Sequence, residues 1–262
     1  MDVSADLADD LDLLVNAARD AGPIALRYFK RDPQTWDKCD GAGPVTEADL
    51  AVNTMLADRL RAARPDYGWL SEESPDSTDR LSARRCFIID PIDGTRAFID
   101  GQDSFAHSLA IAEGGVVIAA AVFLPAKNRM YSAHAASDAQ LNGQSIRAST
   151  QGNEAGASVL TSKPNMQPIH WPGGVPDLHR AFRPSLAYRL CLVAQGRFDA
   201  MLAFRPTWEW DIAAGALIAA RAGAVASDGA GAALRFNAPD PRTQGVIVAA
   251  PGLHTNLVAR RG

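Results

Sequence analysis

Apolar residues near the N-terminus recur at the spacing of an amphipathic helix. They follow one another at steps of four and three residues: Leu7, Leu11, Leu14, Ala18 and Ala21. Residues at this spacing share one face of an α-helix. The Gly-Pro pair at residues 22–23 predicts a bend, because proline cannot donate the backbone hydrogen bond of a regular helix.

A second helix is predicted between residues 46 and 64. Thr46 is a typical N-cap residue, and Asp49 follows it by three positions, which is the spacing of a capping box. Pro65 ends the pattern, since proline is disfavoured inside a helix.

Short apolar runs that end in acidic residues come next. Residues 67–74 and 84–91 are each typical of a strand. The segment 104–134 predicts an antiparallel meander that turns at Gly114-Gly115 and again near residues 125–128, where glycine, proline and asparagine favour turns. The first half of the chain is therefore expected to pack helices on a mostly antiparallel sheet.

After residue 149 the pattern changes to the alternation of strands and helices that is typical of α/β structure. We expect two layered subdomains that form one catalytic unit, an α+β part at residues 1–145 and an α/β part at residues 146–262, because no long flexible linker separates them. The predicted strands are 158–163, 197–204, 224–228 and 244–251, and the predicted helices are 184–196 and 210–223.

The composition is that of a globular protein. Of the 262 residues, 47% are hydrophobic and 21% are charged, and the formal net charge is −4. Lysine and arginine residues are scattered, so the positive stripe that binds a polymeric nucleic acid is not expected. A small anionic ligand stays open, because a local site can be positive in an acidic protein.

The cysteines, the charge of the N-terminal segment and the longest apolar run indicate the cellular compartment. Cys39, Cys86 and Cys191 are odd in number and far apart, which argues against a disulfide framework or a CxxC metal site. The N-terminal segment is acidic where an export signal is basic. The longest apolar run, Val116–Leu124, is too short to cross a membrane. We expect a cytoplasmic protein without a membrane partner.

The segment IIDPIDGTRAFIDG at residues 88–101 combines features of a cation site and a phosphate site. Asp90 and Asp93 stand where an apolar strand ends, and hard divalent cations prefer carboxylate oxygens. Gly94-Thr95 permits a tight turn into a short helix whose N–H groups can face an anion. The alternative is structural, with Asp93-Gly94 as a simple turn and Asp90 as an N-cap.

Further acidic residues stand at the ends of predicted elements. Glu72 and Glu73 close a strand, Asp211 opens a helix, and Asp49 stands near the start of the second helix. A solvated pair, an N-cap and a capping acid are the alternative interpretations of these positions. Carboxylates that converge without a cation repel one another and raise their pKa values, so a cluster of these acids is expected to hold metal.

Other catalytic signatures do not occur in the sequence. The five histidines form no HExxH motif and no close pair, which disfavours a zinc site. The chain also has no GxSxG, Walker or GxGxxG motif. Metal binding by carboxylates is the chemistry that the sequence favours.

Four motifs, in this order, resemble those of the inositol monophosphatase family. They are VTEAD at 45–49, SEES at 71–74, DPIDGT at 90–95 and WDIAAG at 210–215. The resemblance runs from about Lys38 to Ala224. It implies a lithium-sensitive, magnesium-dependent phosphatase with the layered αβαβα sandwich that this family shares with fructose-1,6-bisphosphatase.

The resemblance implies a metal centre. Two or three Mg²⁺ ions would be held by one backbone carbonyl and four carboxylates, those of Ile92, Glu72, Asp90, Asp93 and Asp211. Glu73 stands outside this ligand set. Mg²⁺ prefers oxygen ligands and keeps part of its water shell, which suits such a site.

The resemblance also implies the groups that act on the phosphate. The N–H groups of Gly94 and Thr95 would bind its oxygens. The Thr95 hydroxyl, hydrogen-bonded to Asp49, would help to orient or deprotonate the attacking water, with Glu72 as a third catalytic residue. Lys38 stands near the position of a family lysine beside the metals.

The substrate class depends on the segment before Asp211. Inositol phosphatases usually have an acid seven residues before this aspartate, where this chain has Phe204. The segment FRPTWEWDIAAG more closely resembles the branch of 3'(2'),5'-bisphosphate nucleotidases, which act on adenosine 3',5'-bisphosphate. The candidate substrate contacts are Phe204 for the nucleoside, Arg205 or Arg96 for a second phosphate, and Glu209.

Other functions stay open. Inositol 1-phosphate is the second candidate substrate, and histidinol phosphate is the third, because DGTRAF resembles the histidinol phosphatase branch. A non-catalytic, metal-binding regulatory domain is the alternative from a different class, and the complete set of acids with Thr95 argues against it. The expected partner is a small phosphorylated metabolite, and the chain is expected to be a monomer or homodimer.

Overall fold

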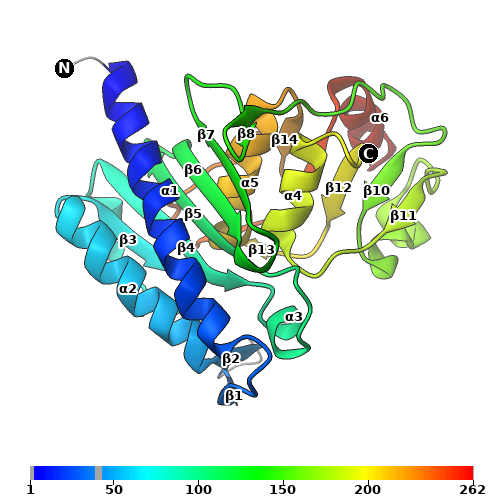
Figure 1. Ribbon diagram of the computed structural model, residues 1–262. Coiled ribbons are helices and arrows are strands. Elements are labelled where there is room, and N and C mark those ends of the chain that lie inside the picture. Colours follow the sequence, from blue (N-terminus) through cyan, green and yellow to red (C-terminus); the bar gives the residue numbers. More distant parts are fainter. Residues whose placement is uncertain (1–2, 39–42, 262) are drawn as a thin grey trace.

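Alternating layers of helices and sheets make up the protein (Figure 1). The computed structural model describes residues 3–38 and 43–261. A helix pair, a seven-stranded sheet, a second helix pair, a five-stranded sheet and a last helix follow one another. The helices of these layers are α1 (Val3–Tyr28) with α2 (Glu47–Ala63), α4 (Leu186–Ala194) with α5 (Glu209–Arg221), and α6 (Pro251–Arg261). This is the αβαβα sandwich that the resemblance implies.

The two N-terminal helices form where the sequence predicts them. The apolar face of α1 packs with α2 against the first sheet, and Leu14 and Leu56 are fully buried in this core. Helix α1 runs on through Pro23 as one element, and the bend predicted near Gly22-Pro23 stays a prediction. At the start of α2, Thr46 and Asp49 form the predicted capping box.

The first sheet contains the predicted meander. Strand β3 runs parallel to β4, and the strands from β4 onward pair antiparallel with their neighbours. The strands lie in chain order: β3 (Gly68–Ser71), β4 (Arg85–Asp93), β5 (Ala106–Glu113), β6 (Val116–Leu124), β7 (Arg129–His134), β8 (Gln140–Leu141) and β9 (Gln144–Ser145).

Strand β4 is buried along its whole length, because helices cover both faces of the sheet. Phe87 and Ile89 pack with α1 and α2, whereas Cys86 and Ile88 pack with α4 and α5. A strand covered on both faces needs an unbroken apolar run instead of alternation. The acidic residues at its end are therefore carried into the interior.

The second sheet is mixed and has the order β11-β10-β12-β16-β14. Its strands are β10 (Ser158–Leu160), β11 (His179–Ala181), β12 (Ala200–Ala203), β14 (Val225–Ser227) and β16 (Val246–Ala249). The core between the two sheets draws residues from both halves of the chain. The division into subdomains at residues 1–145 and 146–262 stays a prediction.

Several short elements leave no pattern in the sequence. They are β1 (Thr35–Asp37) with β2 (Pro44–Thr46), and β13 (Thr207–Trp208) with β15 (Arg242–Thr243). Strands of two or three residues are too short for a periodicity to be recognised. Helix α6 is not predicted from the sequence either; it packs Leu253 and Leu257 against the second sheet. In the described part of the chain, no helix combines the length and apolar character needed to cross a membrane.

Candidate active site

The chain leaves the first sheet sharply at the end of β4. The pairing of β4 with β5 shifts register between Asp90 and Asp93, so the residues between them lie outside the regular ladder. Gly94 adopts a φ of 98°, a left-handed conformation that favours glycine. Helix α3 (Thr95–Ile99) begins at the next residue. The predicted turn into a short helix is confirmed.

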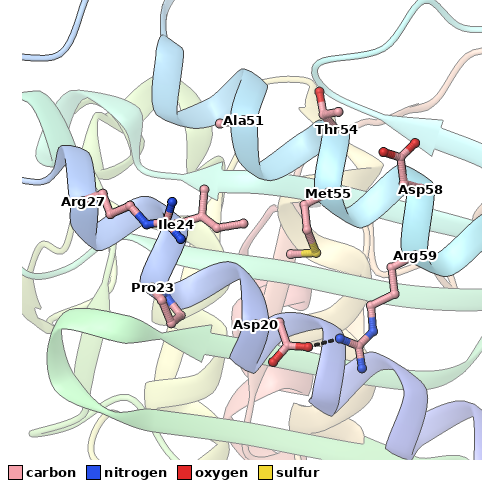
Figure 2. Close-up of a pocket in the computed structure, with 9 residues that line it drawn as sticks. All are labelled: Asp20, Pro23, Ile24, Arg27, Ala51, Thr54, Met55, Asp58 and Arg59. Atoms are coloured by element: carbon pink, nitrogen blue, oxygen red, sulfur yellow. Dashed lines mark ion pairs between the residues drawn. The ribbon is translucent and has the colours of Figure 1, made fainter.

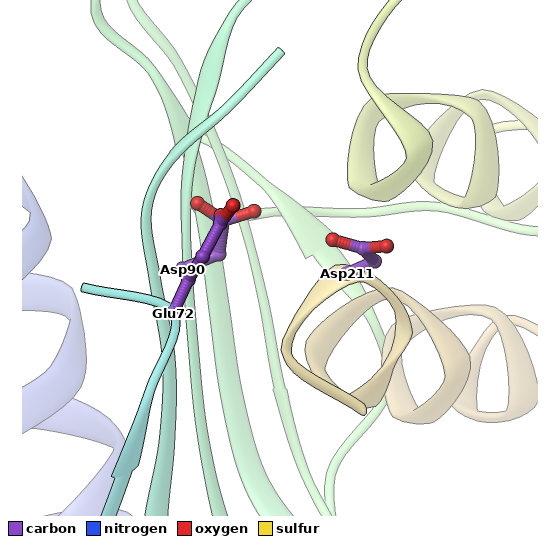
Figure 3. A group of neighbouring side chains, drawn as sticks. All are labelled: Glu72, Asp90 and Asp211. Carbon is purple, nitrogen blue, oxygen red and sulfur yellow. The ribbon is translucent and has the colours of Figure 1, made fainter. Parts of the chain in front are cut away.

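Three carboxylates converge beside this turn (Figure 3). Glu72 follows β3, Asp90 lies within β4, and Asp211 lies in the first turn of α5. One oxygen of each lies within 4.8 Å of the other two. Because Trp208 is the N-cap of α5 and Asp90 lies inside a strand, the alternative interpretation of both aspartates as N-caps is wrong.

The group of three fits a divalent cation. Oδ1 of Asp90 is buried and has no hydrogen-bond partner among the described residues. Burial, and then the charges of neighbouring carboxylates, raise the pKa values of Asp90 and Asp211 well above their usual range. A cation among the three would satisfy the unpaired oxygen and offset the repulsion. The donors are all oxygen atoms, which suits Mg²⁺.

Lys38 lies at the edge of this group. Its Nζ is 2.6 Å from Oε1 of Glu72 and 2.5 Å from Oε1 of Glu73. The structure therefore brings the lysine to the carboxylates, as the resemblance implies. Burial raises the pKa of Glu73 to about 7, and Glu73 lies outside the group of three.

Asp93 departs from the arrangement implied by the resemblance. Its Oδ2 accepts hydrogen bonds from Ser185 Oγ at 2.5 Å and from Ala187 N at 2.6 Å, and its Oδ1 accepts one from Leu186 N at 3.2 Å. These donors are at the start of α4, where backbone N–H groups lack partners within the helix. The structure does not bring Asp93 into the group of three, and its role as a metal ligand stays a prediction.

Thr95 connects the turn to α2. Its hydroxyl is 3.2 Å from Oδ1 of Asp49 and 3.1 Å from the carbonyl oxygen of Ile92. Oδ2 of Asp49 accepts from the N–H of Thr46 at 2.9 Å and from its hydroxyl at 2.6 Å. Burial raises the pKa of Asp49 to about 6, although the bonds from Thr46 lower it. Asp49 is thus both a capping residue and a partner of Thr95.

A cleft of about 720 Å³ contains the three carboxylates. Gly94 and Thr95 line it beside them. Three arginines line the same cleft: Arg96 from α3, Arg189 from α4 and Arg205 after β12. The cleft therefore joins a group of carboxylates to a set of cationic side chains, an arrangement suited to a phosphate ester held through metal ions.

Arg189 is a site residue that the sequence analysis misses. Only 9% of it is exposed, and burial lowers its pKa to about 10. In the part of the chain that the structure describes, its hydrogen bonds go to the carbonyl oxygens of Arg183 and Pro184 and not to a carboxylate. The sequence signal is a single charge in the helix LAYRLCLVA, since a buried charge needs a function or a partner.

Phe204 faces away from the cleft. Its ring packs on Trp171, with centroids 5.4 Å apart, and on the guanidinium of Arg261. The residues on either side, Ala203 and Arg205, line the cleft, because successive side chains of an extended chain point in opposite directions. The structure therefore gives Phe204 a packing role beside α6 instead of the predicted contact with substrate.

Glu209 also lies outside the cleft lining. It is 1% exposed, and its carboxylate accepts hydrogen bonds from the backbone N–H groups of Asn237 and Ala238. Its neighbours Trp208 and Trp210 line the cleft instead, stacked with ring centroids 4.6 Å apart. Glu209 therefore binds the loop at residues 237–238, and its predicted contact with substrate stays a prediction.

A second hollow lies between α1 and α2 on the outer side of the molecule (Figure 2). Pro23, Ile24 and Met55 line it, and Asp20 forms an ion pair with Arg59 beside them. Within the described ranges, it holds no group of three side chains able to bind a metal. The candidate chemistry therefore belongs to the cleft with the three carboxylates.

Comparison with known proteins agrees with this site. A model of the inositol monophosphatase family matches residues 6–261. The chain belongs to the inositol monophosphatase family. It is accordingly a metal-dependent hydrolase of phosphoric monoesters.

Curated relatives in the family carry different names at similar identity. The chain is 32% identical to the 3'(2'),5'-bisphosphate nucleotidase CysQ of Escherichia coli, over 86% of this chain and 93% of that protein. It is 32% identical to the inositol-1-monophosphatase of Rhizobium meliloti, over 84% and 86%. It is 33% identical to the Nus factor SuhB of Pseudomonas aeruginosa, over 83% and 84%. These likenesses show the family and leave the substrate open.

Solved structures share the fold over nearly the whole chain. The inositol monophosphatase of Thermotoga maritima superposes with a TM-score of 0.82 at 29% identity, covering 96% of both chains. The extragenic suppressor protein SuhB of Bartonella henselae gives a TM-score of 0.84 at 25% identity, covering 96% of this chain and 98% of that one. The layered fold is therefore that of the family.

Proposed function

We propose that this phosphatase removes the 3'-phosphate of adenosine 3',5'-bisphosphate. The observation that carries the proposal is the cationic lining beside the carboxylates, where Arg189 is buried without a carboxylate partner in the described chain. Arg205 lines the same cleft. A substrate with two phosphates would place one phosphate at the carboxylates with their metal ions and the other at the arginines. Inositol 1-phosphate and histidinol phosphate have only one phosphate. Trp208, 37% exposed, offers an aromatic surface to a nucleoside.

We propose that two or three Mg²⁺ ions are held by the group of three, Glu72, Asp90 and Asp211, with the Ile92 carbonyl and Asp93 as further ligands. Convergence of the three carboxylates and the unpaired Oδ1 of Asp90 support the group of three. When bound, Mg²⁺ neutralises phosphate oxygens, makes a bound water more acidic and stabilises the leaving alkoxide. Lys38 supplies a further positive charge beside Glu72.

Thr95 and Asp49 act on the attacking water in this proposal. Ionised Asp49 accepts the hydrogen bond of the Thr95 hydroxyl, so the Thr95 oxygen is free to accept a proton from water. The proton of Thr95 can pass to Asp49 as the water attacks phosphorus. The N–H groups of Gly94 and Thr95, at the start of α3, bind the phosphate oxygens. The hydrogen bond between Thr95 and Asp49 supports these roles.

The proposed partner is a small phosphorylated metabolite. We propose that the protein acts in the cytoplasm as a monomer or homodimer. Cys86 and Cys191 are free thiols, both buried, which fits a reducing compartment. Cys39 lies outside the described residues.

Inositol 1-phosphate is the second candidate substrate. It is favoured by the inositol-1-monophosphatase of Rhizobium meliloti, which is as similar to this chain as the nucleotidase of Escherichia coli. Position 204, where inositol phosphatases usually have an acid, holds Phe204, which faces away from the cleft, so this position does not decide between the candidates. Histidinol phosphate is the third candidate, on the strength of the segment DGTRAF.

The test is phosphate release from the three compounds at the same Mg²⁺ concentration. We expect kcat/KM to be highest for adenosine 3',5'-bisphosphate. Asp211→Asn, purified in the same way, measures contaminating phosphatase activity and is subtracted. Faster hydrolysis of inositol 1-phosphate or histidinol phosphate would contradict the proposed substrate and leave the phosphatase assignment intact.

A further inference from the structure

Glu209 is tied to a loop that is distant in the sequence. Its Oε2 accepts a hydrogen bond from Asn237 N at 2.5 Å, and its Oε1 accepts one from Ala238 N at 3.0 Å. Glu209 is the first residue of α5 and Asp211 follows it by two positions. The loop at residues 237–238 therefore fixes the end of the helix that carries Asp211.

Arg80 also forms hydrogen bonds with the loop at residues 237–238. Arg80 is 3% exposed. Its Nη1 donates to Asn237 Oδ1 at 2.7 Å, and its Nη2 donates to Ala238 O at 2.9 Å. The remaining donors form an ion pair with Asp76 at 2.7 Å and 3.0 Å. The planar guanidinium thus uses its fork of N–H groups on three partners at once.

Arg80 belongs to the part of the chain that carries Glu72. Its backbone lies so close to Gly68, at the start of β3, that a Cβ there would come within 2.9 Å of it. Strand β3 ends at Ser71, directly before Glu72. The connection therefore runs from Glu72 back along β3 to the contact between Gly68 and Arg80, and from Arg80 through the hydrogen bonds of residues 237–238 to Glu209, two residues before Asp211.

We propose that Arg80, Asn237 and Glu209 are positioning residues that set the distance between Asp211 and the pair Glu72 and Asp90. The proposal rests on the metal centre proposed above. The carboxylates repel one another and belong to different elements, so their convergence must be enforced by the surrounding structure. Mg²⁺ demands near-ideal octahedral geometry at about 2.0–2.1 Å, and small displacements of a ligand weaken its binding. None of the three positioning residues is among those lining the cleft.

Asn237 allows the tie to be cut without changing the backbone. Its φ is 58°, so Asn237→Gly keeps the left-handed conformation and removes both side-chain bonds to Arg80, at Oδ1 and at Nδ2. Asn237→Asp keeps the oxygen that faces Arg80. We expect Asn237→Gly to weaken Mn²⁺ binding roughly tenfold, a loss typical of supporting residues around a metal, and Asn237→Asp to restore it.

Asn142→Gly is the matched control. Asn142 also has a left-handed conformation, with a φ of 50°. Its side chain also makes two hydrogen bonds, with Met130 N and Asn128 O. It lies at the turn between β8 and β9, away from the cleft. We expect this variant to lose thermal stability as Asn237→Gly does, with Mn²⁺ affinity unchanged.

Binding is measured on the full chain without substrate, from the electron paramagnetic resonance signal of free Mn²⁺, and thermal unfolding is measured in EDTA. Weaker Mn²⁺ binding in Asn237→Gly alone supports the positioning role. Wild-type affinity in Asn237→Gly, or an equal loss in Asn142→Gly, overturns it and leaves the metal centre standing. A wild-type chain that binds no Mn²⁺ overturns the proposed metal centre and this inference together.

Discussion

The hydroxyl of Thr95 lies 3.2 Å from Oδ1 of Asp49, although the two residues are 46 positions apart and belong to different helices. Thr46 binds the other oxygen of Asp49 with its N–H and its hydroxyl. The carboxylate is therefore fixed by the cap of α2 and presents one oxygen to Thr95. The capping box of α2 thus orients the Asp49 carboxylate toward Thr95, where it can accept a proton.

Removing this hydroxyl should slow catalysis more than it weakens metal binding. Thr95→Ala leaves the three carboxylates in place and deletes the group that we propose accepts a proton from water. We expect kcat to fall roughly 10²-fold or more, with the Mg²⁺ concentration for half-maximal activity nearly unchanged. Steady-state kinetics with Mg²⁺ titrations measure both. Thr95→Ser, which keeps a hydroxyl, should retain much of the rate, and an unchanged kcat in Thr95→Ala would remove the residue from the mechanism.

Neutralising Asp211 should stabilise the protein in the absence of metal and should greatly reduce the activity of the protein with Mg²⁺. Asp211→Asn removes one of three mutually repelling carboxylates, and burial together with these neighbouring charges raises the pKa of Asp211 well above its usual range. We expect Tm in EDTA to rise and activity with Mg²⁺ to fall by about 10²-fold or more. Differential scanning calorimetry and a phosphate-release assay measure the two effects.

Magnesium and a second variant provide the controls for Asp211. Mg²⁺ at about 100 times its Kd should stabilise the wild type by roughly 2.7 kcal/mol and leave Asp211→Asn nearly unchanged. Asp93→Asn should instead lower Tm in EDTA, because Leu186 N and Ala187 N donate to different oxygens of Asp93 and an amide replaces one of these oxygens by an NH2 donor. Equal behaviour of the two variants would mean that Asp93 and Asp211 do not differ in the way the structure indicates.

Much of the fold follows from local patterns that are strong in the sequence. The capping box at Thr46 and the apolar meander from β5 to β7 mark their own boundaries, because periodicity and turn residues agree there. The pairing of β1 with β2 has no such signal, since three residues cannot show a period. Helix α6 has a short apolar face, with Leu253 and Leu257 buried and Val258 partly buried, which is too little to distinguish it from a loop.

Some features of the candidate site can be predicted from sequence motifs, and others depend on tertiary packing. Glu72, Asp90 and Asp211 stand in motifs, and the structure gathers them. Contacts that depend on tertiary packing were beyond the sequence: nothing in it indicates that Asp93 faces the start of α4. The sequence does not show which side of the chain Phe204 faces, because neighbouring residues of an extended segment point in opposite directions. The packing of Phe204 against Trp171 shows that its ring faces the core.

His107 should make stability depend on pH. It is fully buried in β5, and its Nδ1 lies 2.5 Å from the carbonyl oxygen of Pro91, so the neutral ring donates its Nδ1–H. Burial lowers its pKa to about 4, below the usual value of about 6.5. Protonation therefore favours the unfolded chain, and this contribution to stability is complete above about pH 6.5 and is lost as the pH falls toward 4.

The comparison variant is His107→Asn, whose amide can still donate to Pro91 but does not titrate. Between pH 7.5 and pH 5 the wild type should lose about 2 kcal/mol of unfolding free energy relative to this variant. Other titrating groups are common to both proteins and cancel in the difference. Urea unfolding at several pH values in EDTA measures it, and parallel pH profiles would show that His107 does not carry the effect.

The second phosphate of the proposed substrate needs a cationic partner in the cleft. Arg205 and Arg96 both line the cleft and are both exposed, but Arg205 lies near enough to Arg189 for its charge to lower the pKa of Arg189. Two neighbouring guanidinium groups suit a phosphate better than one does. We therefore expect Arg205 to contact the second phosphate, and Arg96 serves as the matched exposed arginine.

Loss of a charge-assisted contact is worth on the order of 2 kcal/mol, or about thirtyfold in kcat/KM. In Arg205→Ala, kcat/KM should fall by that factor with adenosine 3',5'-bisphosphate. It should change little with inositol 1-phosphate, which has no second phosphate for Arg205 to contact. Arg96→Ala should show a smaller loss with the bisphosphate. The selective loss should also shrink at high salt, because exposed charges are screened. Equal losses with both substrates would assign Arg205 to the phosphate that is hydrolysed, and equal losses in both variants would remove the distinction between the two arginines.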